Sequence, residues 1–115
     1  MSGVMSGAES HGGQAVTQVR IVLPRQLGDL AGIDGEAVVE VVGVATVTAS
    51  LDALEDLHPR LVGTIRDRAT RTRRPMIRLY ADGEDLTNSP ASDPLPPAVV
   101  AGQQPLRVVG AIAGG

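Results

Sequence analysis

Apolar and polar residues alternate in the first patterned stretch of the chain. Val19, Ile21 and Leu23 recur at every second position, which is the period of a half-buried β-strand. Pro24 follows at once and has no N–H to donate to a strand ladder. We therefore expect the first strand over residues 16–23.

A second strand is expected over residues 36–42, where β-branched residues alternate again with polar ones. The stretch between the two strands, residues 26–35, holds three glycines and two aspartates and ends in the turn signal Asp34-Gly35. It predicts a loop with room for one helical turn. The two strands then form a hairpin with a long connection.

The hydrophobic period changes to that of a helix after residue 46. Three leucines fall on one side of this helix and three carboxylates on the other: Leu51, Leu54 and Leu57 against Asp52, Glu55 and Asp56. The pattern predicts an amphipathic helix over residues 47–58, with its carboxylates as the solvent-exposed face. Thr46 or Thr48 can cap its N-terminus, and Pro59 ends it.

The remainder of the chain predicts shorter elements. In order, they are a short helix beginning at Pro59, a polar connection over residues 66–74, a strand over residues 76–81, a turn at Asp82-Gly83 with a short return strand at Leu86, an irregular loop over residues 88–97, a helical turn over residues 97–101 and a last strand over residues 104–109. This order predicts a small α+β domain with its main helix on one face of a sheet.

One folded domain is expected, between two segments without periodic apolar residues. Residues 1–15 are rich in glycine and serine and bury too little apolar surface to offset the entropy of ordering, so we expect a flexible N-terminal arm. The domain is expected over residues 16–109. Residues 110–115 are small and Gly-rich, and we expect a flexible C-terminal tail there.

Composition excludes several kinds of chemistry. The 115 residues include no cysteine, so disulfides, thiolate metal sites and cysteine nucleophiles are ruled out. Lysine is absent too, and all ten basic residues are arginine. The net charge of -3 gives no general attraction to nucleic acid or to an anionic membrane. No apolar run approaches the roughly 18 residues of a membrane span and no signal peptide is visible, so a cytoplasmic location is expected.

Three features together resemble the MoaD/ThiS family of ubiquitin-like sulfur carriers. They are the order of the elements, the turn Ala81-Asp82-Gly83-Glu84-Asp85 after the third strand, and a last strand that runs directly into Ala111-Ile112-Ala113-Gly114-Gly115. The resemblance covers about residues 17–115. It implies the β-grasp fold of ubiquitin, in which a mixed sheet packs on one main helix, and it implies a carrier protein and not an enzyme.

The resemblance implies chemistry at the α-carboxylate of Gly115. An E1-like adenylyltransferase would adenylate this carboxylate with ATP, a sulfurtransferase or other persulfide donor would convert it to a thiocarboxylate, and an acceptor enzyme would take the sulfur. Gly114 and Gly115 have no Cβ and suit a narrow channel in a partner. Ala113, Ile112 and Ala111 would add slim apolar contacts there. No bound cofactor is implied, because the ATP is used by the partner.

The sulfur acceptor stays open between a molybdopterin-type and a cysteine-type pathway. The segment from Ile21 to Leu27 lacks the aromatic residues usual in the small subunits of molybdopterin synthases, so the chain looks closer to carriers that feed cysteine synthesis or other acceptors. Two further classes stay open. One is a protein modifier conjugated through Gly115, and the other is a ubiquitin-like binding module whose tail takes part in no chemistry.

Arginines gather between residues 66 and 78, where six of them and a single aspartate give a local charge of +5. The first interpretation is a solvated basic loop, and the second is a docking surface for an acidic partner. A nucleic-acid site would need aromatic stacking residues or a recognition motif, and neither is present. As possible docking residues we single out Arg73, Arg74, Arg78, Tyr80 and Val109.

Metal binding is not expected, because His11 and His58 have no further histidine or cysteine at ligand spacing. His58 is better interpreted as a cap for the carbonyls at the end of its helix. No serine is paired with a histidine in a recognisable catalytic pattern, and no Gly-rich phosphate-binding loop precedes a helix. Side-chain catalysis therefore has no candidate in this sequence.

Overall fold

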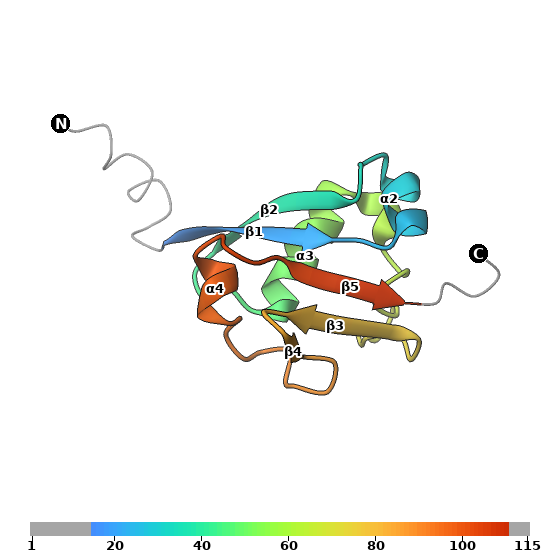
Figure 1. The fold of residues 1–115 in the computed structure, drawn as a ribbon. Coiled ribbons are helices and arrows are strands. Elements are labelled where there is room, and N and C mark those ends of the chain that lie inside the picture. Colours follow the sequence, from blue (N-terminus) through green and yellow to red (C-terminus); the bar gives the residue numbers. More distant parts are fainter. Residues whose placement is uncertain (1–14, 111–115) are drawn as a thin grey trace.

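The computed structural model describes residues 15–110, and its framework is one mixed sheet (Figure 1). The five strands of this described part are β1 (Val16–Val22), β2 (Glu36–Val42), β3 (Ile77–Ala81), β4 (Glu84–Asp85) and β5 (Leu106–Gly110). They lie in the order β2-β1-β5-β3-β4 across the sheet. β5 is the central strand, parallel to β1 and antiparallel to β3, while β1 with β2 and β3 with β4 form antiparallel pairs.

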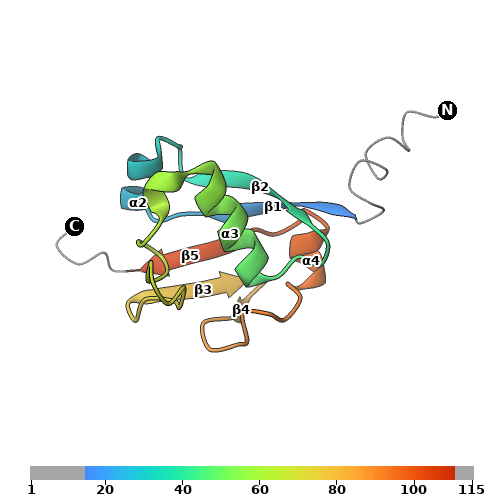
Figure 2. The same ribbon diagram turned by 180° about the vertical axis from the view of Figure 1, so that it is seen from behind.

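Helical segments surround this sheet unevenly. They are α2 (Arg25–Ala31), α3 (Val47–Leu57), the 3-10 helix η1 (Pro59–Leu61) and α4 (Pro97–Val100). α3 runs across one face of the sheet, as Figure 2 shows, while α2 and α4 lie at opposite ends of it. The expectation of an α+β fold with one main helix on one face of a mixed sheet is confirmed. No helix of the described part is both long enough and apolar enough to cross a membrane.

The alternating apolar residues of the strands form an aliphatic core between the sheet and α3, as expected. Its inward-facing strand residues are Val19, Ile21, Val39, Val41, Ile77, Leu79, Leu106 and Val108. β1 and β2 pair in an unbroken register from Val16 opposite Val42 to Val22 opposite Glu36, which is the predicted hairpin. The predicted strand bounds agree with the structure to within two residues, since hydrophobic period 2 is a strong signal when one face is buried.

The turn after β3 requires a backbone that few residues adopt. Asp82 and Gly83 both have positive φ angles, 51° and 76°. Positive φ at both central residues is the mark of a type I′ turn, which matches the right-handed twist of two adjacent strands. The Asp-Gly signal in the sequence is therefore confirmed, and β4 is the short return strand that it leads to.

The main helix begins as expected but buries a different face. Thr46 is the N-cap, and its Oγ1 accepts the Ala49 N–H at 3.0 Å. The buried residues of α3 are Val47, Ser50, Leu51, Leu54 and Glu55. Leu57 was expected on the core side, but it is 59% exposed because α3 ends there and Leu61 of η1 is the leucine that enters the core. Glu55 was expected in solvent, and its burial has a specific cause described below.

α2 is longer than the sequence predicted. A single helical turn was expected within residues 26–35, whereas the structure has a seven-residue helix. The Pro24 carbonyl accepts the N–H groups of Leu27 and Gly28, both at 3.0 Å, and Leu27 is buried. α2 packs against η1, a contact made by a segment about thirty residues later. A helix with a glycine at its centre and one core leucine carries too weak a local signal to be predicted from sequence when tertiary packing is what stabilises it.

Candidate functional site

The end of β5 fixes the point from which the predicted reactive tail leaves the domain. Gly110 is the last residue of β5 and pairs with Ile77 at the start of β3. A Cβ placed on Gly110 would lie 2.7 Å from Ile77 Cδ1 and 3.0 Å from the Met76 carbonyl oxygen. A Cβ here would require the Ile77 side chain and the Met76 carbonyl to shift. Glycine here therefore allows the end of the central strand to pack tightly against the start of β3.

The residues expected to act chemically lie beyond this point. Gly115, its threading neighbours Gly114, Ala113 and Ile112, and Ala111 are all outside the described residues. Their roles stay predictions.

Three of the five residues singled out for docking share one surface, the face of the sheet opposite α3. Arg78 of β3 is directly opposite Val109 of β5, and Tyr80 is opposite Arg107. Arg78, Val109 and Arg107 are exposed, and Tyr80 is half-buried. Arg107 was not singled out, although the alternation of Leu106 and Val108 with Arg107 and Val109 places it on this open face.

The other two docking candidates, Arg73 and Arg74, lie elsewhere. Arg73 Nη1 donates to the carbonyl oxygens of Ile77 at 2.7 Å and Arg74 at 3.0 Å. On the β4 side of β3, Leu79 accepts the Leu86 N–H and donates its own N–H to Thr87 Oγ1. Backbone groups two residues apart on a strand point to the same side, so the Ile77 carbonyl also points to that edge. Arg73 therefore covers the outer edge of β3. Arg74 donates through Nε to the Gly63 carbonyl, within the loop between η1 and β3.

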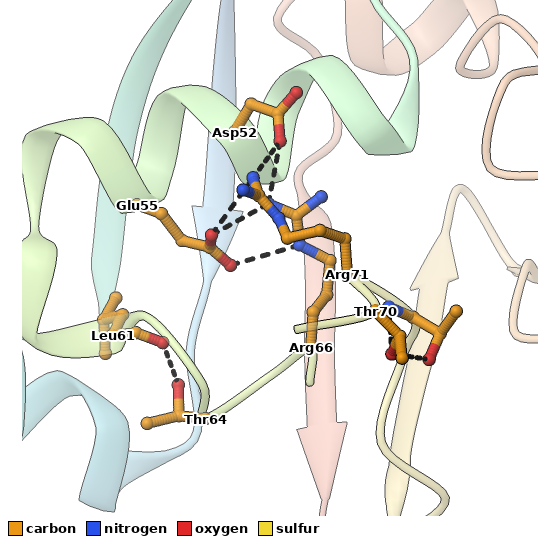
Figure 3. Close-up of polar contacts among 8 residues, drawn as sticks. Asp52, Glu55, Leu61, Thr64, Arg66, Thr70 and Arg71 are labelled. Atoms are coloured by element: carbon orange, nitrogen blue, oxygen red, sulfur yellow. Dashed lines mark hydrogen bonds and ion pairs between the residues drawn. The ribbon is translucent and has the colours of Figure 1, made fainter. Parts of the chain in front are cut away.

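Part of the arginine-rich loop is anchored to α3 by a cluster of ion pairs (Figure 3). Arg66 donates from Nε to Glu55 Oε2 at 3.1 Å, and from Nη2 to Glu55 Oε1 at 2.9 Å and Asp52 Oδ1 at 2.8 Å. The side chains of Arg66 and Glu55 are each only 6% exposed. Arg71 completes the cluster with contacts of 2.7 Å to Asp52 and 3.5 Å to Glu55. The bidentate Arg66–Glu55 contact satisfies both buried charges.

The electrostatics of Arg66 follow from this geometry. Burial disfavours the charged guanidinium and by itself would lower the pKa of Arg66, but the hydrogen bonds and charges of Glu55 and Asp52 outweigh it and raise the pKa. Arg66 is therefore cationic at every physiological pH. The expectation that Glu55 belongs to a solvent-exposed acidic face is wrong, because a buried cation eleven residues later accompanies it into the interior.

A tight turn carries the loop back from Arg66 to Arg73, which form an isolated antiparallel bridge. Asp67 Oδ1 accepts the N–H groups of Ala69 and Thr70, both at 2.9 Å. These bonds to the charged form, first from Thr70 and then from Ala69, lower the pKa of the Asp67 carboxyl. The first interpretation, a solvated basic loop, thus holds only for part of the segment, because two carboxylates of α3 partly neutralise it.

The comparisons with known proteins agree with this architecture. SAMP1 from Haloferax volcanii superposes with a TM-score of 0.65 at 23% identity, over 85% of this chain and 99% of that one. The small archaeal modifier protein 1 (SAMP1) from Methanosarcina acetivorans gives 0.63 at 18% identity, over 88% and 99%. A chain of the Amycolatopsis orientalis BexX/CysO complex gives 0.61 at 20% identity, over 84% and 99%. The chain has the β-grasp fold.

No protein-family model matches the chain, and no curated protein matches it in sequence. Structural likeness at this level of identity establishes the β-grasp fold, as the sequence resemblance implied. Functional residues must accordingly be argued from this chain's own geometry.

Within the described part of this domain, the candidate side chains lie on surfaces suited to binding. Among residues 15–110, no three histidine, aspartate or glutamate side chains converge as a metal site would require. His58 is at the C-terminal end of α3, where its backbone N–H donates to the Leu54 carbonyl at 2.8 Å. The predicted cap is thus made by the backbone of His58. The open sheet face and the end of β5 are the features that suit binding to another protein.

Proposed function

We propose that this β-grasp protein is a sulfur carrier whose working group is the carboxylate of Gly115. The observation that supports it most is the position of β5: the central strand of the sheet ends at Gly110, and the sequence continues as Ala-Ile-Ala-Gly-Gly. The chain also shares its fold with SAMP1 and with a chain of the BexX/CysO complex.

The chemistry requires partners, because a carboxylate is a poor electrophile and the described residues offer no activating group. In the proposal, the Gly115 carboxylate attacks the α-phosphorus of ATP on an E1-like adenylyltransferase, and pyrophosphate leaves. The terminal sulfur of a persulfide donor then displaces AMP and forms an acyl disulfide, which a partner thiol reduces to the thiocarboxylate. An acceptor enzyme takes this sulfur for a cofactor or metabolite of the molybdopterin or cysteine type.

Docking of these partners is assigned to the open face of the sheet next to the end of β5. Arg78, Tyr80, Arg107 and Val109 form a compact group there, with an exposed aliphatic residue, an aromatic ring and two cations. Such a mixture is typical of interface residues. Arg73 and Arg74 donate to backbone carbonyls at other places, so their part in docking is to hold the edge of β3 and the neighbouring loop.

A second candidate function is conjugation to proteins. It is favoured by the name of two structural neighbours, small archaeal modifier protein 1. In this form, the activated Gly115 carboxyl would be transferred to a lysine amine of another protein. The chain contains no lysine of its own, so it could not build lysine-linked polymers of itself.

The intact mass of the untagged protein separates these possibilities. After incubation with the host's adenylyltransferase, ATP and persulfide donor, the carrier should gain the mass that replaces one oxygen by sulfur, localised to Gly115. A matched control carries one extra alanine after Gly115, which keeps the domain unchanged but moves the carboxylate. No mass gain in the unmodified protein would refute the carrier proposal. Thiol-resistant conjugates to lysine residues of other proteins would establish the modifier instead.

A further inference from the structure

The two edges of the sheet are protected very differently. At one edge, β4 has only two residues and Arg73 covers the adjacent Ile77 carbonyl. At the other edge, β2 runs for seven residues with an unbroken register to β1 and so has no bulge. Proteins normally blunt such an edge with lysine, proline, a bulge or a covering segment. β2 has no proline or lysine, and its only charged residues are two glutamates.

The pairing pattern shows which backbone groups of β2 are free. The N–H of Leu23 donates to the Gly35 carbonyl and the N–H of Gly43 to the Ala15 carbonyl, both at 2.8 Å. Hydrogen-bonded pairs recur at every second residue of an antiparallel ladder, so Val39 also bonds to β1. Val38 and Glu40 therefore direct their N–H and C=O groups away from β1. Neither makes a backbone hydrogen bond to another described segment.

A groove of about 510 Å³ lies along this edge and is lined by residues of β2 and α3. Figure 2 shows where these two elements lie in the fold. Its apolar lining comes from Val38 and Val39 on the strand and from Ala53 and Leu57 on the helix. Val38 is 49% exposed and Leu57 is 59% exposed, so apolar surface faces solvent next to the free backbone groups.

The charge at this groove has one sign. Glu40 and Asp56 contribute carboxylates to the lining, and no arginine or histidine does. Neither carboxylate forms an ion pair with any residue in the part of the chain that the structure describes. The groove therefore favours a segment that carries positive charge.

We propose that the β2 edge binds an extended, basic segment of a partner protein, which adds a sixth strand to the sheet. Backbone groups of Val38 and Glu40 would supply the main-chain hydrogen bonds, while aliphatic side chains of the segment fill the groove beside Leu57. Arginine or lysine side chains of the segment would pair with Glu40 and Asp56. A second copy of this chain is disfavoured, because its own β2 edge would bring the same carboxylates to the seam. The site is separate from the tail, so it stands whatever the fate of Gly115.

The first experiment uses the full chain, labelled with ¹⁵N, and the acetylated and amidated peptide Arg-Val-Thr-Val-Arg-Val-Thr. Binding should shift the amide signals of residues 36–42 and 53–57. It should also slow hydrogen exchange at Val38 and Glu40, which gain acceptors, and change it little at Val39, which is already bonded. Shifts confined to the open face, or no change in exchange at Val38 and Glu40, would overturn the proposal. Protection that depends on protein concentration without peptide would assign the edge to a second copy.

Charge provides the second test. A peptide with glutamate in place of both arginines should bind roughly tenfold more weakly, the effect of two partly exposed charge pairs. The variant Glu40→Arg/Asp56→Arg should reverse this preference, whereas Glu84→Arg on the opposite edge should leave it unchanged. All these residues are exposed, so the fold tolerates the changes. Equal affinity of the wild-type chain for both peptides would contradict the charge argument.

Discussion

Replacing Arg66 with methionine would remove the cation that accompanies Glu55 into the interior. The Glu55 carboxylate, 6% exposed, would lose its bidentate partner at 2.9 and 3.1 Å. Arg71 would keep its 2.7 Å contact to Asp52 and its longer, 3.5 Å contact to Glu55. Breaking a buried ion pair from one side costs about 3–5 kcal/mol. We therefore expect Arg66→Met to lower the free energy of unfolding by about 3–5 kcal/mol at pH 7.

Urea unfolding followed by circular dichroism measures this loss. With a typical slope for a domain of this size, the midpoint should fall by roughly 1.5–3 M. The matched control is Arg71→Met, the same chemical change at a side chain that is 53% exposed, and it should cost no more than about 1 kcal/mol.

A double variant tests the mechanism itself. Glu55→Leu/Arg66→Met replaces both charges with apolar groups and should recover most of the stability that the single variant loses, since no buried charge remains. Equal losses for Arg66→Met and Arg71→Met would refute the assignment of a buried, mutually dependent pair. A double variant no more stable than Arg66→Met would refute it as well.

Three further predictions concern the tail and the loop. Gly110→Ala should cost about 1–3 kcal/mol of unfolding free energy in urea, because its Cβ would press on the Met76 carbonyl, whereas the exposed control Val109→Ala should change little. The pKa of the Asp67 carboxyl is lowered in the folded protein, so its charged form stabilises the fold above the ordinary pKa of 3.8, and this stability is lost as the pH falls further. Asp67→Ala should therefore lower the urea midpoint near pH 6 but not near pH 2. Gly114→Val should abolish adenylation by the partner enzyme, measured as pyrophosphate release, with an unchanged unfolding midpoint; normal release from the folded variant would contradict the threading role.

The elements that the sequence predicted correctly are those with a local cause. Alternation at Val19 and Ile21 depends only on which face of one strand is buried, and the turn at Asp82-Gly83 depends only on two backbone conformations. Both signals lie within a few residues, so no knowledge of the tertiary structure is needed to interpret them.

The errors have causes that are distant in sequence. Glu55 has the pattern of a solvent-exposed helix residue, and only the position of Arg66 in space explains its burial. Leu57 looks like a core residue until η1 supplies Leu61 in its place. The docking candidates show the same limit, because Arg73 was grouped with Arg78 by closeness in sequence, while the fold places them on an edge and on the open face respectively.

The central position of β5 also determines how the domain responds to a pull on its C-terminal end. A force applied at Gly110 along the strand axis acts on the ladders to β1 and to β3 at the same time, in shear. Their hydrogen bonds must then yield together, whereas a peeling load at an edge strand breaks them one after another. A partner that binds the residues after Gly110 and pulls them into a channel would therefore move the domain as a rigid body without unfolding it.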